Sequence, residues 1–290
     1  MRRWVVLALA AMLALAPAGC AQHFEGVDGD LTNGWQPMPA ATAFRPAAGT
    51  CHSELTQTGT IDSYSPVPCT GTHVAETVAV ADLTGATGLK TPEAGLPKAF
   101  AACSKQLTAF LGADWRTGWV LLQPVLPGKT AWAGGARWFR CDVAETSPVD
   151  GALVRRAGSM KDTIKTGKLR MACANPTIHG ESVSEMHPVA CPSSHTAEFA
   201  GLFETSVKRS DDLTSKALAT GCDRVIAKFT GLPNDSSLES RIGWLGFPPD
   251  DTAWQMGDRA IRCFLWLNGE KMAGSYRNAG PSRLKIHYSD

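Results

Sequence analysis

The chain has 290 residues, enough for two ordinary domains, and its 28 basic and 27 acidic residues leave a net charge of only +1. This balance argues against a protein that wraps nucleic acid. With 44% hydrophobic and 19% charged residues, the composition is that of a globular protein and excludes disordered and fibrous classes. Nine cysteines without a Cys-x-x-Cys pair argue against thioredoxin-like and zinc-ribbon proteins.

The N-terminal segment, residues 1–19, has the pattern of a signal peptide. Two arginines precede the apolar run 5–18, which is too short to cross a bilayer comfortably. The sequence Ala18-Gly19-Cys20 resembles the end of a bacterial lipobox, in which the cysteine receives a lipid. We therefore expect lipidation at Cys20 and residence on the outer face of the cytoplasmic membrane, with ordinary secretion as the alternative.

The cysteine count supports export independently. Removing Cys20 leaves an even number that can close as four disulfides in an oxidising compartment. Loss of residues 1–19 also leaves a side-chain charge of −1, so the membrane contact is expected through the acyl chains and not through basic residues. Residues 20–48 mix Gly, Pro, Ala and Asn without an apolar period, which predicts a flexible tether behind the lipid anchor.

The rest of the chain reads as a tandem repeat. Eight cysteines form two sets of four whose members are 122, 122, 119 and 122 residues apart. The sets are Cys51, Cys69, Cys103 and Cys141, then Cys173, Cys191, Cys222 and Cys263. We place the two repeats at residues 49–165 and 166–290.

Each repeat is predicted to be an α+β unit, with one helix packed on a small antiparallel sheet. Apolar residues recur at three and four over 92–111, and a second helix opens at Ser210 and ends before Gly231. Short β-prone stretches flank the helices at 74–80, 119–122, 199–203 and 261–267. The helical cysteines Cys103 and Cys222 lie on the apolar stripes, so they are expected to face the cores.

Confining disulfides to each repeat leaves nine of the 105 possible pairings. Sequence order favours the first cysteine with the second and the third with the fourth in each repeat. The favoured bonds are Cys51–Cys69, Cys103–Cys141, Cys173–Cys191 and Cys222–Cys263. The crossed pairings within each repeat stay open at this point.

The recurring motifs resemble the actinobacterial "septum formation" family of exported domains, over roughly 49–161 and 171–277. A Cys-x-x-x-His-x-x-Glu element falls on Cys69, His73 and Glu76, and again on Cys191, His195 and Glu198. A Trp-x-x-Gly-x-Arg-x-x-x-Cys element falls on Trp132, Gly135, Arg137 and Cys141, and again on Trp254, Gly257, Arg259 and Cys263. Between these motif positions, Ala136 stands where Asp258 keeps an acid. The resemblance implies an envelope setting and a link to cell division, but no reaction.

The recurring polar residues are expected to have structural roles. His73 with Glu76, and His195 with Glu198, offer two ligands per repeat beside cysteines that export should oxidise, so we predict no metal. We expect each histidine to hydrogen-bond the backbone or the glutamate. Trp132 and Trp254 are expected in the core. Two arginine pairs, Arg137 with Arg140 and Arg259 with Arg262, are expected on the surface or in local salt bridges.

The sequence contains no nucleophile elbow, paired-carboxylate or phosphate-loop motif, so we assign no catalytic residue and no cofactor. We predict a non-catalytic binding or scaffolding lipoprotein whose partner is an envelope protein or a cell-wall polymer. Two alternatives remain: an envelope hydrolase or metal-dependent enzyme built on the His-x-Ala-Glu pairs, and a ligand-carrying lipoprotein with a cleft between the repeats.

Overall fold

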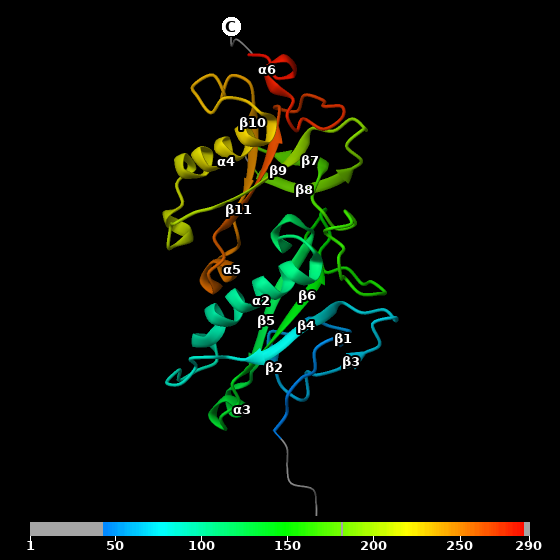
Figure 1. Cartoon of the computed structure of the whole chain (residues 1–290), viewed down its shortest axis with the longest axis vertical. Helices are drawn as coiled ribbons and strands as arrows, with labels where there is room; N and C mark the ends of the chain where they lie inside the picture. Colours follow the sequence, from blue (N-terminus) through cyan, green and yellow to red (C-terminus); the bar gives the residue numbers. More distant parts are fainter. Residues whose placement is uncertain (1–42, 181, 287–290) are drawn as a thin grey trace, which may run out of the picture. The chain divides into compact units, whose positions relative to one another are not determined.

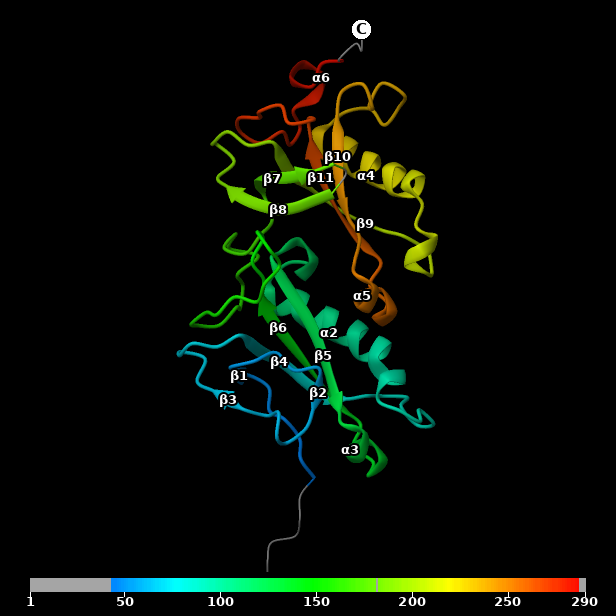
Figure 2. The same cartoon turned by 180° about the vertical axis from the view of Figure 1, so that it is seen from behind.

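Two sheets, each with one long helix packed against it, make up the computed structural model (Figures 1 and 2). The structure describes residues 43–180 and 182–286. The predicted signal peptide, the lipidation site Cys20 and most of the predicted tether lie outside the described residues. Residues 43–290 are assigned to one compact unit. We call residues 43–165 the first half and residues 166–286 the second half.

The first sheet has six strands in the order β2-β5-β6-β4-β1-β3, and all its pairings are antiparallel except β2 with β5. The strands are β1 Cys51–His52, β2 Thr58–Gly59, β3 Pro66–Val67, β4 Ala75–Asp82, β5 Val120–Pro127 and β6 Trp138–Glu145. The predicted strands at 74–80 and 119–122 match β4 and the start of β5. The short strands β2 and β3 have too few residues to show a period.

The second sheet has five antiparallel strands in the order β10-β11-β9-β7-β8. The strands are β7 Cys173–His179, β8 Ser182–Val189, β9 Ala197–Glu204, β10 Gly243–Phe247 and β11 Ala260–Trp266. Read in chain order, they occupy the same positions as β1, β3, β4, β5 and β6 of the first sheet. Among the described residues, the second half has no counterpart of β2, and its β7–β8 hairpin is longer, as Figure 2 shows.

The helix α2 Leu96–Leu111 packs against β4, β5 and β6, and the helix α4 Ser215–Thr230 packs against β9, β10 and β11. Both end at a glycine in the left-handed conformation, Gly112 and Gly231, as the sequence predicts. The predicted helix starts, at residues 92 and 210, lie about one turn before the observed starts at Leu96 and Ser215. The 3-10 turns η1 Glu93–Gly95 and η3 Ser210–Asp212 precede the helices, and Thr214 caps α4 through Ala217 N–H.

The remaining helices are shorter. They are α3 Lys129–Ala133, α5 Asp251–Met256, α6 Gly280–Arg283 and the 3-10 turn η2 Trp115–Thr117. None of the described helices combines the length and hydrophobicity needed to cross a bilayer.

The structure has four disulfides, two within each half. They are Cys51–Cys69 and Cys103–Cys141 in the first half, and Cys173–Cys191 and Cys222–Cys263 in the second. These are the pairings that sequence order favours. Cys103 and Cys222 are fully buried, so each helix is bonded to the strand beneath it through the core. Four disulfides in one chain are typical of a protein exported from the cytoplasm.

Candidate functional site

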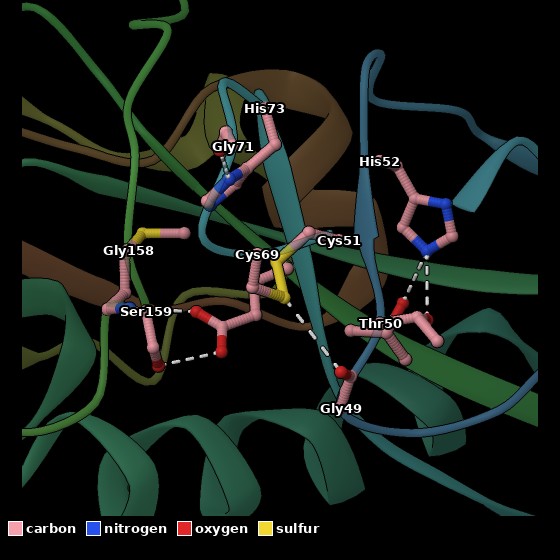
Figure 3. Close-up of a disulfide and its surroundings, with 12 residues drawn as sticks. Gly49, Thr50, Cys51, His52, Cys69, Gly71, His73, Gly158 and Ser159 are labelled. Carbon is pink, nitrogen blue, oxygen red and sulfur yellow. Dashed lines mark hydrogen bonds between the residues drawn. A yellow bond between two sulfur atoms is a disulfide. The ribbon is translucent and has the colours of Figure 1, made fainter. Parts of the chain in front are cut away.

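The Cys-x-x-x-His-x-x-Glu motif forms a cluster around a disulfide in the first half (Figure 3). Cys51 on β1 lies opposite Glu76 on β4 and bonds Cys69, which precedes the strand. His73 is fully buried, and its backbone exchanges two 2.9 Å hydrogen bonds with Arg156. The turn that carries the disulfide is therefore tied to a distant segment of the same half.

The second half has the same arrangement. Cys173 on β7 lies opposite Glu198 on β9 and bonds Cys191. His195 is fully buried and exchanges backbone hydrogen bonds with Met272. We call the two arrangements the Cys-His-Glu clusters.

Each histidine ring is held by a carbonyl two residues earlier in the chain. His73 Nδ1 lies 2.9 Å from Gly71 O, and His195 Nδ1 lies 2.8 Å from Ser193 O. Because a carbonyl only accepts, Nδ1 carries the proton in both rings. The two Nε2 atoms are buried, and no described residue hydrogen-bonds them. The predicted bond to backbone is present, and neither ring hydrogen-bonds a hydroxyl group.

Each glutamate carboxylate accepts two hydrogen bonds from a distant Gly-Ser turn. Glu76 accepts from the Ser159 hydroxyl and from Met160 N–H, both at 2.7 Å. Glu198 accepts from the Ser275 hydroxyl and, at 2.7 Å, from the backbone N–H of Tyr276. The carboxylate fixes the turn that follows the last strand.

Sequence reasoning missed the partner of the glutamate. The sequence Ala-Gly-Ser by itself indicates only a turn, whereas the hydroxyls of Ser159 and Ser275 each donate to a carboxylate about eighty residues away. The signal was present, because Ala-Gly-Ser recurs in both halves together with the His-x-Ala-Glu element.

Two groups of possible metal ligands occur among the described residues: Cys51 with Cys69 and Glu76, and Cys173 with His195 and Glu198, each within 4.8 Å. All these sulfur atoms are in disulfides, so no thiolate is available. A zinc site needs three or four ligands. With the disulfides closed, each cluster offers only a histidine and a glutamate whose oxygens already accept hydrogen bonds.

The Trp-Gly-Arg elements build the short helices. Trp132 on α3 and Trp254 on α5 are buried, as expected. Arg137 and Arg259 stack on these rings at 4.1 and 4.6 Å, and each donates at 2.6 Å to the carbonyl of its tryptophan. Both arginines are half-buried, and their contacts are with a ring and backbone carbonyls and not with an acid. Their guanidinium groups satisfy the carbonyls at the helix end.

The first half also contains a buried polar network that the sequence did not indicate. Arg140 and Asp142 lie on the face of β6 opposite Cys141, and their side chains are 1% and 0% exposed. The two form a salt bridge of 2.8 Å, and Arg140 also donates to the Thr56 hydroxyl at 2.8 Å. Of the two expected settings, the surface or a local salt bridge, Arg140 has the local salt bridge, and the pair is fully buried.

The network continues to a buried histidine. Thr77 donates its hydroxyl to Asp142 Oδ1 at 2.7 Å, so His52 Nε2, 2.9 Å from the same hydroxyl oxygen, donates to it. Burial lowers the pKa of His52 from 6.5 to about 4, the Arg140 cation acts in the same direction, and the Ser65 backbone opposes them. Burial raises the pKa of Asp142, while Arg140 and Thr77 oppose that rise.

The corresponding positions of the second half are apolar. At a spacing of 122 residues, His52, Thr77 and Asp142 correspond to Ala174, Phe199 and Phe264. Phe199 and Phe264 stack edge to face at 5.2 Å within an apolar cluster. The arginine is kept as Arg262, but its acid is not. The two halves thus share their Cys-His-Glu clusters and differ on this sheet face.

Two of the hollows on the described surface bear on ligand binding. One, of about 670 Å³, lies where β2 meets β5 and has Phe44, Ile61 and Leu126 in its wall, with Ile61 68% exposed. The other, of about 440 Å³, lies between the two halves and includes Trp119, Phe247 and Arg262.

Comparison with known proteins identifies one family. The family model described as "Septum formation" matches residues 48–263, which include both Cys-His-Glu clusters. No curated protein and no solved structure matches the chain.

Proposed function

The chain belongs to the septum formation family, and we propose that it serves septum formation as a non-catalytic binding or scaffolding module on the outer face of the cytoplasmic membrane. In this proposal Cys20 carries the lipid, and the residues between Cys20 and residue 43 link the anchor to the folded part, to which Arg45 is already joined through Asp82.

One observation carries the non-catalytic part of the proposal. In both halves the motif's glutamate is hydrogen-bonded to a serine and an amide, and the motif's histidine is hydrogen-bonded to a carbonyl. A general base needs a proton to abstract within reach, and these groups are engaged in holding turns. We attribute their recurrence to a tandem duplication that kept the fold's internal supports. One sheet face is polar in the first half and apolar in the second. This difference favours a module whose two halves bind different partners.

Export and anchoring are tested by acylation. Metabolic labelling with a fatty-acid analogue should mark the wild-type protein and fail on Cys20→Ala, which should be released from the membrane. A Cys20→Ala protein that labels and sediments with membranes like the wild type would contradict the lipid anchor.

The role in division is tested by depletion. Cells that lose the protein should show misplaced or incomplete septa, and a fluorescent fusion should gather at the division site. His73→Ala, compared at matched amounts of folded protein, should restore normal septa because the ring supports only the fold. Loss of septation with His73→Ala at normal folded amounts would instead favour the enzyme alternative.

A specific observation favours the ligand-carrying alternative, namely the hollow between the two halves. A ligand pocket typically encloses 300–1,000 Å³. The hollow of about 440 Å³ falls in this range. A ligand bound in this hollow would fit both the proposed binding module and the ligand-carrying alternative.

A further inference from the structure

The hollow between the two halves, which we call the inter-half cleft, is built from both sequence halves. Its walls include Trp119 and Leu121 of the first half and Phe247 of the second half. Leu121 is one of three large hydrophobic residues that are exposed among the described residues, at 36%. These side chains give the cleft an apolar surface that water does not solvate well.

Arg262 supplies a cation in this cleft. Its first-half counterpart Arg140 is paired with Asp142, whereas the residue two positions after Arg262 is Phe264. The only hydrogen bond that the Arg262 side chain makes within the described residues is from Nε to Arg116 O, at 2.9 Å. Its two terminal guanidinium nitrogens have no acceptor there.

Asp258 does not form a salt bridge with Arg262. Asp258 accepts from Arg116 Nε at 2.8 Å, and no carboxylate of the described residues lies within 4.0 Å of the Arg262 nitrogens. Burial lowers the pKa of Arg262, as does the Arg116 cation, and Asp258, Asp114 and Asp250 oppose this effect from a distance. The Arg262 side chain is half-buried, and a partly desolvated cation without a contacting anion carries a cost that a bound anion would offset.

Four carboxylates line the same cleft; Asp258 pairs with Arg116, which leaves three, Asp150, Glu185 and Asp250. Asp150 and Asp250 accept backbone N–H groups of their own turns, and Glu185 contacts His187 at 2.8 Å. Within the described residues, no lysine or arginine lies within 4.0 Å of any of the three. The cleft therefore offers one guanidinium group without a carboxylate partner and three carboxylates without a lysine or arginine partner. Apolar side chains line the same cleft.

We propose that the inter-half cleft binds a peptide that carries a free carboxylate and a nearby ammonium group. The peptide carboxylate pairs with the terminal nitrogens of Arg262, the ammonium group lies against Asp150, Asp250 or Glu185, and an apolar side chain packs on Trp119 and Phe247. A phosphate dianion fits less well, because the three carboxylates repel a second negative charge. The inference rests on the proposed binding function and names the ligand class of the module.

The test uses the full-length protein in detergent and the tripeptide Leu-Lys-Ala with a free C-terminus, followed by isothermal titration calorimetry. We expect saturable binding, at least tenfold weaker for the C-terminal amide of the same peptide. Arg262→Gln should weaken binding of the free acid at least tenfold and leave the weak binding of the amide unchanged. Arg209→Gln removes an arginine outside the cleft and should bind like the wild type.

Several outcomes would overturn the proposal: no saturable binding at millimolar peptide, equal binding of acid and amide, or competition by inorganic phosphate as effective as that of the peptide acid. The acid–amide comparison uses the wild-type protein, so it stands even if Arg262→Gln fails to fold. Failure of peptide binding with normal septal localisation would reject this ligand and leave the proposed function intact.

Discussion

At the scale of single residues, the glutamates of the Cys-His-Glu clusters give a clear test of structure against catalysis. Glu76→Ala leaves the Ser159 hydroxyl and the Met160 amide without their acceptor, and a buried unpaired group costs about 1–3 kcal/mol. Glu76→Gln should cost less, because the glutamine oxygen can accept from the amide while the serine hydroxyl rotates to accept from the new NH₂ group. Chemical denaturation of both variants measures the difference.

The same pair of substitutions at Glu198 provides the matched control. Because Ser275 and Tyr276 replace Ser159 and Met160 in the same geometry, the two halves should respond with similar losses of unfolding free energy. A catalytic carboxylate would behave differently, since glutamine would abolish activity as completely as alanine. Equal losses for alanine and glutamine at either position would contradict the structural interpretation.

His52 should make the stability of the protein depend on pH. Its pKa is about 4 in the folded state against 6.5 ordinarily, so the unfolded chain binds the proton first as the pH falls. The stabilisation is complete above pH 6.5, decreases between pH 6.5 and about 4, and changes no further below that. Each pKa unit corresponds to about 1.4 kcal/mol, so the whole effect is about 3 kcal/mol. Unfolding free energies measured across this range check it.

His52→Gln isolates the contribution of the ring. Glutamine retains an N–H donor for the Thr77 hydroxyl but does not titrate, so the slope of stability against pH should flatten between pH 4 and 6.5. An unchanged slope in the variant would assign the pH dependence to other groups.

Residue patterns could predict which side chains recur, but not the partners that tertiary structure brings to them. The His-x-Ala-Glu element was recognisable, whereas the serine that binds Glu76 lies 83 residues away in sequence. For Arg140, a local salt bridge was one of the two expected settings. Its partner Asp142 and the burial of the pair were not predicted, because burial depends on the segments that cover this face of the sheet.

At the scale of elements, Gly221 shows how helix and sheet are matched in the second half. A Cβ at this position would lie 2.2 Å from the Phe203 ring on β9. Gly221→Ala gains about 1 kcal/mol of helix propensity but overpacks the interface, which costs about 1–3 kcal/mol. Because this contact is so short, we expect the penalty to be larger and the melting temperature to fall.

A second substitution tests that cause. In a Phe203→Leu background the ring is gone, so Gly221→Ala should be neutral or stabilising. The first half supports this expectation, because the corresponding positions there are Ala102 and Ala81, a larger residue on the helix opposite a smaller one on the strand. A similar loss from Gly221→Ala in both backgrounds would rule out the clash.

Long elements were predictable because their side chains repeat a period. The helices 92–111 and 210–230 were recognised from apolar spacing and their terminal glycines, and the structure differs mainly in the 3-10 turns at their starts. The hairpin of β7 and β8 was missed. Its strand β8 is mostly exposed, so its residues carry no apolar alternation that a sequence pattern could show.

At the scale of the whole molecule, contacts between the halves had no sequence signal. The repeat spacing relates equivalent positions, but a contact between the two halves joins positions that are not equivalent. Arg116 is 142 residues from Asp258, which it binds, and the first-half counterpart of that acid is Ala136. The one indication in the sequence was that the second half has Asp258 where the first half has Ala136.

The Arg116–Asp258 pair should make the two halves unfold together. Asp258 is 4% exposed, and the side chain of Arg116 is 13% exposed. Removing one partner of a buried pair costs about 3–5 kcal/mol, and we expect the lower end because Arg116 is only partly buried. Scanning calorimetry should therefore show one transition for the wild type, and two separated transitions or one markedly broader transition for Asp258→Ala.

A double-mutant cycle separates this pair from the local role of Asp258, whose carboxylate also accepts from Ala260 N–H. Arg116→Gln alone should also broaden the transition, and the double variant should be less destabilised than the sum of the two single variants. The difference measures the coupling across the halves, because the lost Ala260 bond is common to Asp258→Ala and the double variant and cancels. Strictly additive losses, with one sharp transition in every variant, would mean that other contacts, such as the Arg262–Arg116 hydrogen bond and the apolar packing, join the halves.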